Sequence, residues 1–375
     1  MQPGGQPVRQ ISNLQILRAA AALMVAFGHA QHDALVQSLN LGAGFERVHT
    51  LPWGAGVDLF FVISGFILVY ASERVFGRSG GRADFLSRRI ARIVPLYWLF
   101  LSLYIGLVVQ AALGNTRAMP AFVDIVASFG FWPTDAFGDG IPRPLLTLGW
   151  TLNYEMFFYV TLAVFVGLPR VGAVLGTSLV LLTLVGLGEL LSPTSAALYF
   201  WTRPIILEFC FGMGLALLLR GGVSLGPTCR CALVLLALAI LFVDPLRSSQ
   251  QALDWTTPND FSRLLSWGVP AALIVAATIL GPQNRPSPVT RAGVALGDAS
   301  FALYLVHPFV IVGIRKLWLL SELHLRLGLW SMVVTSLILS CVAAILIHHS
   351  VERPLTEWAQ RVFQPRRSQR VAASA

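Results

Sequence analysis

Two ionisable side chains lie on one face of the first apolar segment of the chain. Arg18 and His29 stand eleven residues apart within or beside the run 14–30. In an α-helix this spacing places two side chains ~16 Å apart along the axis and only ~20° apart around it. An imidazole can take a proton from a hydroxyl group near neutral pH, and a guanidinium binds phosphate oxygens through paired hydrogen bonds. The pair suits acid–base chemistry next to a phosphate-binding group, although an arginine reaching toward water and an interfacial histidine are the simpler alternative.

Two of the carboxylates within the other apolar runs are candidate site residues. Asp58 stands near the start of the run 55–72, which places it at about the depth of His29 if the first two runs cross a membrane in opposite directions. A carboxylate beside an imidazole fixes its tautomer and raises its basicity, whereas a carboxylate in the first turn can equally serve to cap its own helix. Glu155 is expected at mid-membrane depth, where it needs a proton or a basic partner, and Arg203 is one candidate.

A basic cluster precedes the third apolar run. Arg88, Arg89 and Arg92 are spaced by three and four residues, so their side chains share one face and can grip phosphates. A cluster of this kind is also what the orientation rule predicts for any cytoplasmic loop. Glu352, near the end of the last run, can orient this cluster, and a plain helix-end charge explains it nearly as well.

A second histidine lies inside an apolar run near the C-terminus. His307 belongs to the segment 297–318 and is followed directly by Pro308. Proline perturbs a helix because it lacks the N–H group and its ring crowds the preceding turn. A histidine beside such a kink suggests the wall of a cavity.

The composition excludes a soluble domain. Hydrophobic residues make up 55% of the 375 residues, charged residues only 12%, and the mean hydropathy is +0.70, whereas charged residues form roughly 25% of soluble domains. We predict an all-α, polytopic membrane protein, a single bundle of about ten transmembrane helices within residues 1–364, followed by a disordered basic tail at 365–375. The predicted spans approach the ~20 residues needed to cross a bilayer, and they are 14–30, 55–72, 93–113, 145–168, 171–191, 199–219, 229–243, 264–280, 297–318 and 327–350.

The net charge of +9 is explained by membrane orientation. The basic residues lie in short segments between apolar runs, not along one solvated face, so a nucleic-acid partner is not expected. With the N-terminus in the cytoplasm, 17 basic residues fall inside and 8 outside, which favours two cytoplasmic termini. The four cysteines have neither CxxC spacing nor histidines at zinc-ligand offsets, so neither a disulfide framework nor a metal site is expected.

Together these segments resemble the acyltransferase-3 family of bacterial membrane O-acyltransferases. Arg18 with ten residues before His29 matches the Arg-x10-His motif of that family. The run GVDLFFVISGF from Gly56 to Phe66 is close to a family signature. Further matches, in chain order, are the Arg88 to Arg92 cluster with Pro95, Tyr97 and Trp98, then Trp150 to Tyr159, Ser300 to His307, and Glu352-Arg353-Pro354.

The resemblance implies a donor and a set of catalytic residues. Acyl-CoA, most commonly acetyl-CoA, would bind from the cytoplasm, with no permanently bound cofactor and no metal. His29 would deprotonate the acceptor hydroxyl or carry the acyl group itself, and Asp58 or Glu155 would orient it. The residues that the resemblance assigns to the donor are Arg18, Arg88, Arg89, Arg92 and Glu352. Those that it assigns to substrate contacts are Trp150, Tyr304 and His307.

The resemblance also implies an acceptor and a location. The acceptor would be a hydroxyl of an exopolysaccharide, a lipopolysaccharide or a related envelope glycan, and the protein would lie in the lipid of the bacterial inner membrane. Two other functions remain open at this point. A transporter or flippase of a polysaccharide precursor would also bury basic and acidic groups, and it favours broken helices in two inverted halves. A non-catalytic component of a polysaccharide assembly complex is the second.

Overall fold

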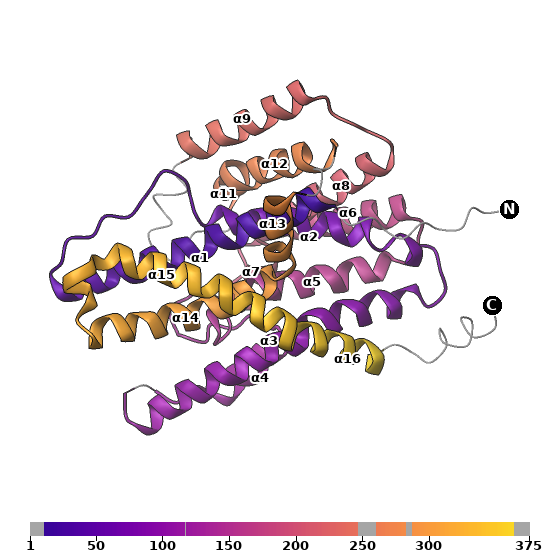
Figure 1. Cartoon of the computed structure of the whole chain (residues 1–375). Helices are drawn as coiled ribbons and strands as arrows, with labels where there is room; N and C mark the ends of the chain where they lie inside the picture. The colour runs from indigo at the N-terminus through magenta and orange to yellow at the C-terminus, as the bar shows by residue number, and fades with distance from the viewer. Residues whose placement is uncertain (1–10, 117, 247–259, 283–286, 364–375) are drawn as a thin grey trace. The chain divides into compact units, whose positions relative to one another are not determined.

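The computed structural model of the chain describes residues 11–116, 118–246, 260–282 and 287–363 (Figure 1). These ranges are mainly helical, and within them the only extended pairing is an isolated bridge between Asp135 and Arg143. The predicted tail at 365–375 lies outside the described residues.

The helices group into two compact units. The first unit is built mainly from α1 (Ser12–Leu41), α2 (Ala55–Tyr70), α8 (Glu208–Arg220), α9 (Pro227–Val243), α11 (Phe261–Arg263), α12 (Val269–Ile279), α13 (Pro288–Asp298), α14 (Ser300–Leu320) and α15 (Leu323–Ile347). The second unit is built from α3 (Gly81–Leu113), α4 (Phe122–Phe129), α5 (Trp150–Phe165), α6 (Arg170–Leu191), α7 (Ala196–Trp201) and α16 (Arg353–Phe363). Short turns join or extend them: η1 (Glu73–Val75), η2 (Thr147–Gly149), η3 (Pro204–Leu207), and the π-turns η4 (Leu264–Gly268) and η5 (His348–Glu352).

Five helical stretches among the described residues are long and apolar enough to cross a membrane: Gly81–Leu113, Arg170–Leu191, Phe261–Ile279, Ser300–Leu320 and Leu323–Phe363. The shorter helices α2 and α9 are also apolar. Seven of the predicted spans coincide with these stretches, and the remaining three fall on α1, α5 and the α7 to α8 region. The fold is that of an all-α, polytopic membrane protein, while ten crossings remain a prediction.

Two predicted boundaries differ from the structure. The basic cluster was expected in a loop, but α3 begins at Gly81 and carries the arginines in its first turns. The segment between Gly81 and Pro95 contains no other glycine or proline and has four arginines and two alanines, which favour a continuous helix. The predicted span 199–219 is broken into α7, η3 and α8, because Pro204 cannot donate a backbone hydrogen bond and disfavours helical geometry at the residue before it.

Small residues bring the helices of the first unit close together. A β-carbon at Gly65 of α2 would lie 2.2 Å from the carbonyl oxygen of Phe209 in α8, and one at Gly212 would lie 2.0 Å from that of Val62. A β-carbon at Gly56 would lie 2.5 Å from the carbonyl oxygen of Ala21, so α1 and α2 also touch backbone to backbone. Such contacts hold helices together in lipid, where the hydrophobic effect no longer drives their association. They fix α1 and its polar face in place.

The second unit packs α3 against α16 and α5, and α5 against α6 (Figure 1). Tyr97 of α3 donates a hydrogen bond to the carbonyl oxygen of Ser128 at 3.2 Å, and the hydroxyl of Ser128 accepts one from the backbone of Leu145 at 2.9 Å. These bonds tie the loop before α5 to α3. Gly149, which precedes the first residue of α5, lies close to α3: a β-carbon there would lie 2.6 Å from the hydroxyl oxygen of Tyr97.

Candidate active site

The predicted site residues divide between the two units. The first unit contains Arg18, His29, Asp58, Tyr304 and His307. The second contains Arg88, Arg89, Arg92, Trp150, Glu155 and Glu352.

A pair of histidines forms the polar centre of the first unit. Nδ1 of His29 in α1 lies 2.7 Å from Nε2 of His307 in α14, and the two ring planes are nearly parallel at 11°. Nδ1 of His307 lies 2.9 Å from the carbonyl oxygen of Leu303, one turn earlier, and His307 is fully buried. The ring of Tyr304 lies 6.1 Å from that of His307, centroid to centroid. The sequence predicted a role for each histidine, but not their contact.

The loop between α1 and α2 folds back onto α1 beside His29. The backbone N–H of Val48 donates to Gln31 of α1 at 2.6 Å, and the indole of Trp53 donates to the carbonyl oxygen of Val48 at 2.7 Å. A β-carbon at Gly28 would lie only 3.0 Å from that of Trp53. This tryptophan therefore packs against the residue next to His29, in the middle of α1.

Arg18 lies inside the first unit and not at its surface. Its side chain is 7% exposed, and one guanidinium nitrogen donates to Gln15 at 2.9 Å. Helix α13 covers this end of α1 so closely that a β-carbon at Gly297 would lie 2.0 Å from the carbonyl oxygen of Gln15. The alternative in which the Arg18 side chain extends into water therefore does not agree with the structure. Arg18 and His29 share one helix, ~16 Å apart along its axis.

The carboxylate that the sequence placed at the depth of His29 is bound by an arginine. Nε and one terminal nitrogen of Arg263 lie 3.0 and 2.8 Å from the two oxygens of Asp58, and both side chains are buried. The guanidinium also lies over the ring of Trp267, 4.9 Å from its centroid. Arg263 is one of the eight basic residues that the charge count places outside, but the structure gives it a buried position at the end of α11. It directly precedes the π-turn η4, which contacts α2.

A second buried carboxylate joins this ion pair. Glu208 is fully buried and interacts electrostatically with both Asp58 and Arg263. A β-carbon at Gly268 would lie 2.7 Å from one of its oxygens, so a side chain there would displace the Glu208 carboxylate. Two carboxylates therefore share one guanidinium. The sequence signal for Glu208 was an acid within an apolar run, but nothing in the sequence connected it to Asp58.

In the second unit, Glu155 lies near an arginine other than the predicted one. Arg203 pairs with Glu189 at 3.8 Å. Glu155 instead acts electrostatically on Arg89, together with Tyr159 and the two neighbouring arginines.

The remaining predicted donor residues of this unit differ in exposure. Arg88 is exposed, and its Nε donates to the carbonyl oxygen of Asp84 at 3.0 Å. Glu352 is 6% exposed and accepts from Nδ1 of His348 at 2.8 Å. It lies in the π-turn that leads into α16, the helix that packs along α3.

Two features of α5 face the interior of the second unit. Trp150 contacts Tyr154 edge to face, with 5.9 Å between the ring centroids. Asn153 is fully buried, and within the described part of the chain neither its amide nitrogen nor its oxygen has a hydrogen-bond partner. Buried amide groups nearly always form hydrogen bonds. Asn153 is therefore a candidate substrate contact, which the sequence analysis did not include among the site residues.

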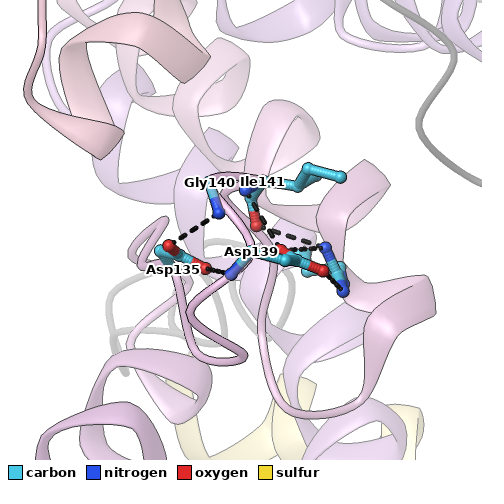
Figure 2. Close-up of polar contacts among 5 residues, drawn as sticks. Asp135, Asp139, Gly140 and Ile141 are labelled. Atoms are coloured by element: carbon cyan, nitrogen blue, oxygen red, sulfur yellow. Dashed lines mark hydrogen bonds and ion pairs between the residues drawn. The ribbon is translucent and has the colours of Figure 1, made fainter.

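The loop before α5 is organised by two aspartates (Figure 2). The carboxylate of Asp135 accepts from the backbone N–H groups of Asp139 and Gly140 at 3.1 and 2.9 Å. Asp139 accepts from the backbone of Ile141 at 3.2 Å and from both terminal nitrogens of Arg143, and the hydrogen bond with Arg143 holds the pKa of Asp139 below its ordinary value. These bonds close the loop on itself, and it serves as a structural element.

No group of three or more histidine, cysteine, aspartate or glutamate side chains that could hold a metal ion occurs among the described residues. The four cysteines, Cys210, Cys229, Cys231 and Cys341, are free thiols.

Apolar helices with a histidine pair, of which His307 is fully buried, and with buried basic groups define a polytopic membrane protein equipped for acid–base chemistry. Residues 11–349 match the acyltransferase domain of the acyltransferase-3 family. The chain belongs to that family, as the sequence motifs predicted, and is a membrane O-acyltransferase.

Curated relatives support this assignment. The exopolysaccharide production protein ExoZ of Rhizobium meliloti strain 1021 is 31% identical over 82% of the chain and 90% of its own length. The acyltransferase MdmB of Streptomyces mycarofaciens is 25% identical over 92% of each chain. The putative peptidoglycan O-acetyltransferase YrhL of Bacillus subtilis strain 168 is 26% identical over 96% of this chain, which spans 57% of that longer protein. No solved structure matches the chain significantly.

Proposed function

We propose that this protein transfers an acetyl group from cytoplasmic acetyl-CoA to a hydroxyl group of an envelope polysaccharide, with exopolysaccharide as the first acceptor to test. The names of ExoZ and YrhL support this acceptor class and an acetyl donor. The observation that carries the chemistry is the contact between His29 and His307, because it supports a partly buried imidazole with a fully buried one. The site would lie in the bacterial inner membrane, with both termini in the cytoplasm.

The transfer itself needs one base and one bound thioester. His29 accepts the proton of the acceptor hydroxyl, and the oxygen forms a bond to the thioester carbonyl carbon. The carbon–sulfur bond then breaks, and the CoA thiolate takes the proton from His29. The products are an ester and free CoA, so no proton is gained or lost overall. General-base assistance of this kind contributes ~10²–10⁴-fold to a rate.

The basic residues are proposed to hold the donor. Arg18 lies ~16 Å from His29 on one helix, a separation that suits the pantetheine arm between a CoA phosphate and the thioester. In the second unit, Arg89 and Arg92 of α3 are further proposed phosphate contacts, with exposed Arg88 supplying charge to the same helix face. Glu352 is proposed to help position the arginine-bearing helix α3 through α16.

The other predicted residues receive narrower roles. Tyr304 and Trp150 are proposed to contact the acyl group or the acceptor. Asp58 is proposed to hold α2 through Arg263, while Glu155 orients Arg89.

Membranes that contain the wild-type protein, His29→Ala or His49→Ala test the proposal with acetyl-CoA labelled in the acetyl group. We expect label on envelope glycan with the wild type and with His49→Ala, because His49 is exposed, and none with His29→Ala. Equal membrane insertion is checked by immunoblot of washed membranes. A His29→Ala protein that still transfers label would remove His29 from the mechanism, and translocation of unmodified precursor without transfer of label would support a transporter.

A further inference from the structure

The ring of His307 lies between a backbone acceptor and the ring of His29. Its Nδ1 is 2.9 Å from the carbonyl oxygen of Leu303, and its Nε2 is 2.7 Å from Nδ1 of His29. The carbonyl of Tyr304 also acts on the His307 ring. In an unbroken α-helix this carbonyl would accept from the backbone of residue 308, but Pro308 has no N–H group to donate. The His-Pro sequence thus leaves a backbone acceptor beside the imidazole.

The carbonyl oxygen of Leu303 determines which ring nitrogen of His307 carries the proton. A carbonyl oxygen can only accept, so Nδ1 of His307 must carry the proton that it donates to Leu303. In a neutral imidazole the other nitrogen is then a lone-pair acceptor. Nε2 of His307 therefore accepts a hydrogen bond from Nδ1–H of His29. By the same rule, Nε2 of His29 has no proton.

The reverse arrangement is unfavourable. If Nε2 of His307 carried the proton and the ring stayed neutral, its bare Nδ1 would face the carbonyl oxygen at 2.9 Å, lone pair against lone pair. If both nitrogens carried protons, a cation would lie at a fully buried position. Burying a charge without a counter-ion costs several kcal/mol or more. His32 is the other titratable group that acts on His29, and it is itself a histidine.

We infer that His307 is a positioning residue, which holds His29 in the tautomer whose Nδ1 is protonated and whose Nε2 carries no proton. The role resembles that of a carboxylate partner of a catalytic histidine, but here a second imidazole and a backbone carbonyl supply it. The consequence for acyl transfer rests on the proposed function. The tautomer itself does not, because it follows from the hydrogen-bond geometry alone.

The tautomer is measured first. Protein labelled with ¹⁵N-histidine in lipid vesicles gives separate ¹⁵N signals for protonated and bare ring nitrogens, and subtraction of the His29→Asn spectrum isolates His29. We expect protonated Nδ1 and bare Nε2 for His29 in the wild type. A proton on Nε2 and none on Nδ1 in the wild type would overturn the inference, whether or not the protein transfers acetyl groups.

Two substitutions of His307 then test its effect on catalysis. Glutamine places an amide oxygen near the former position of Nε2 and can still accept from His29, whereas phenylalanine keeps the ring shape and accepts nothing. We expect His307→Phe to lower kcat by about a hundredfold or more, as a wrong tautomer does in other histidine-dependent enzymes, with the KM for acetyl-CoA unchanged. His307→Gln should restore most of kcat.

The outcomes separate the two proposals. Equal loss in the Gln and Phe variants, or a rise in KM with unchanged kcat, would contradict a positioning role and indicate a structural or substrate-binding role for His307. A wild-type protein that shows the expected tautomer but transfers no acetyl group from acetyl-CoA would refute the proposed function and leave the tautomer assignment in place.

Discussion

Replacing Arg263 by methionine removes the cation that holds two buried carboxylates in the first unit. Asp58 is fully buried and accepts two hydrogen bonds from Arg263, at 3.0 and 2.8 Å, and Glu208 lies in the same cluster. Removing one partner of a buried ion pair costs ~3–5 kcal/mol, because the other charge remains without compensation. Asp58 is the carboxylate that loses its ion-pair partner in Arg263→Met, so we expect a loss within this range.

The loss is measured as a fall in the thermal unfolding midpoint of purified protein in detergent, followed by size-exclusion chromatography. The matched control is Arg353→Met, because Arg353 forms an ion pair of the same type with Glu357 but is 67% exposed. Exposed pairs contribute ~0–1 kcal/mol, so this variant should unfold close to the wild type. Adding Asp58→Asn to Arg263→Met should recover part of the loss by removing one uncompensated charge. An Arg263→Met protein as stable as the control would show that the cluster does not stabilise the first unit.

Two further substitutions test the helix crossing and the aspartate loop. Gly65→Ala places a β-carbon 2.2 Å from the backbone of Phe209, and overpacking of this kind costs ~1–3 kcal/mol. The control is Gly106→Ala, whose β-carbon meets nothing within 4 Å. Equal unfolding midpoints for the two variants would contradict the close contact between α2 and α8. Arg143 lowers the pKa of Asp139, so the contribution of this contact to stability is complete above the ordinary carboxyl pKa of ~3.9 and is lost as the pH falls through the lower folded value. Titration of the Asp139 carboxyl by NMR should give a higher midpoint in Arg143→Gln, and an unchanged midpoint would assign the lowered pKa to another cause.

The membrane architecture was predictable because lipid imposes a composition on the chain. Runs such as 171–191 and 229–243 are predominantly apolar, and the bounds of the helices α6 and α9 agree closely with them. Breaks and extensions were harder to predict. The arginines of α3 were expected in a loop because a charged loop and a charged helix that continues into water have the same hydropathy.

The candidate site was predictable residue by residue but not pair by pair. His29 and His307 were each conspicuous as ionisable groups within apolar runs. Their contact joins positions 278 residues apart, and helical periodicity carries no information over that distance. The partner of Asp58 was missed for the same reason, since Arg263 is 205 residues away and borders its run as an interfacial arginine would.

By itself the sequence determined the membrane environment of this protein, its all-α class, its family and the helix face on which Arg18 and His29 lie. Each of these depends on local composition or on spacing along one helix. The tertiary structure decided which buried polar groups meet. A buried imidazole or carboxylate must find a partner to offset its lost hydration, but many partners satisfy that requirement equally well. The packing of α14 against α1 brings His307 to His29, and the packing of the π-turn η4 against α2 accompanies the pairing of Arg263 with Asp58.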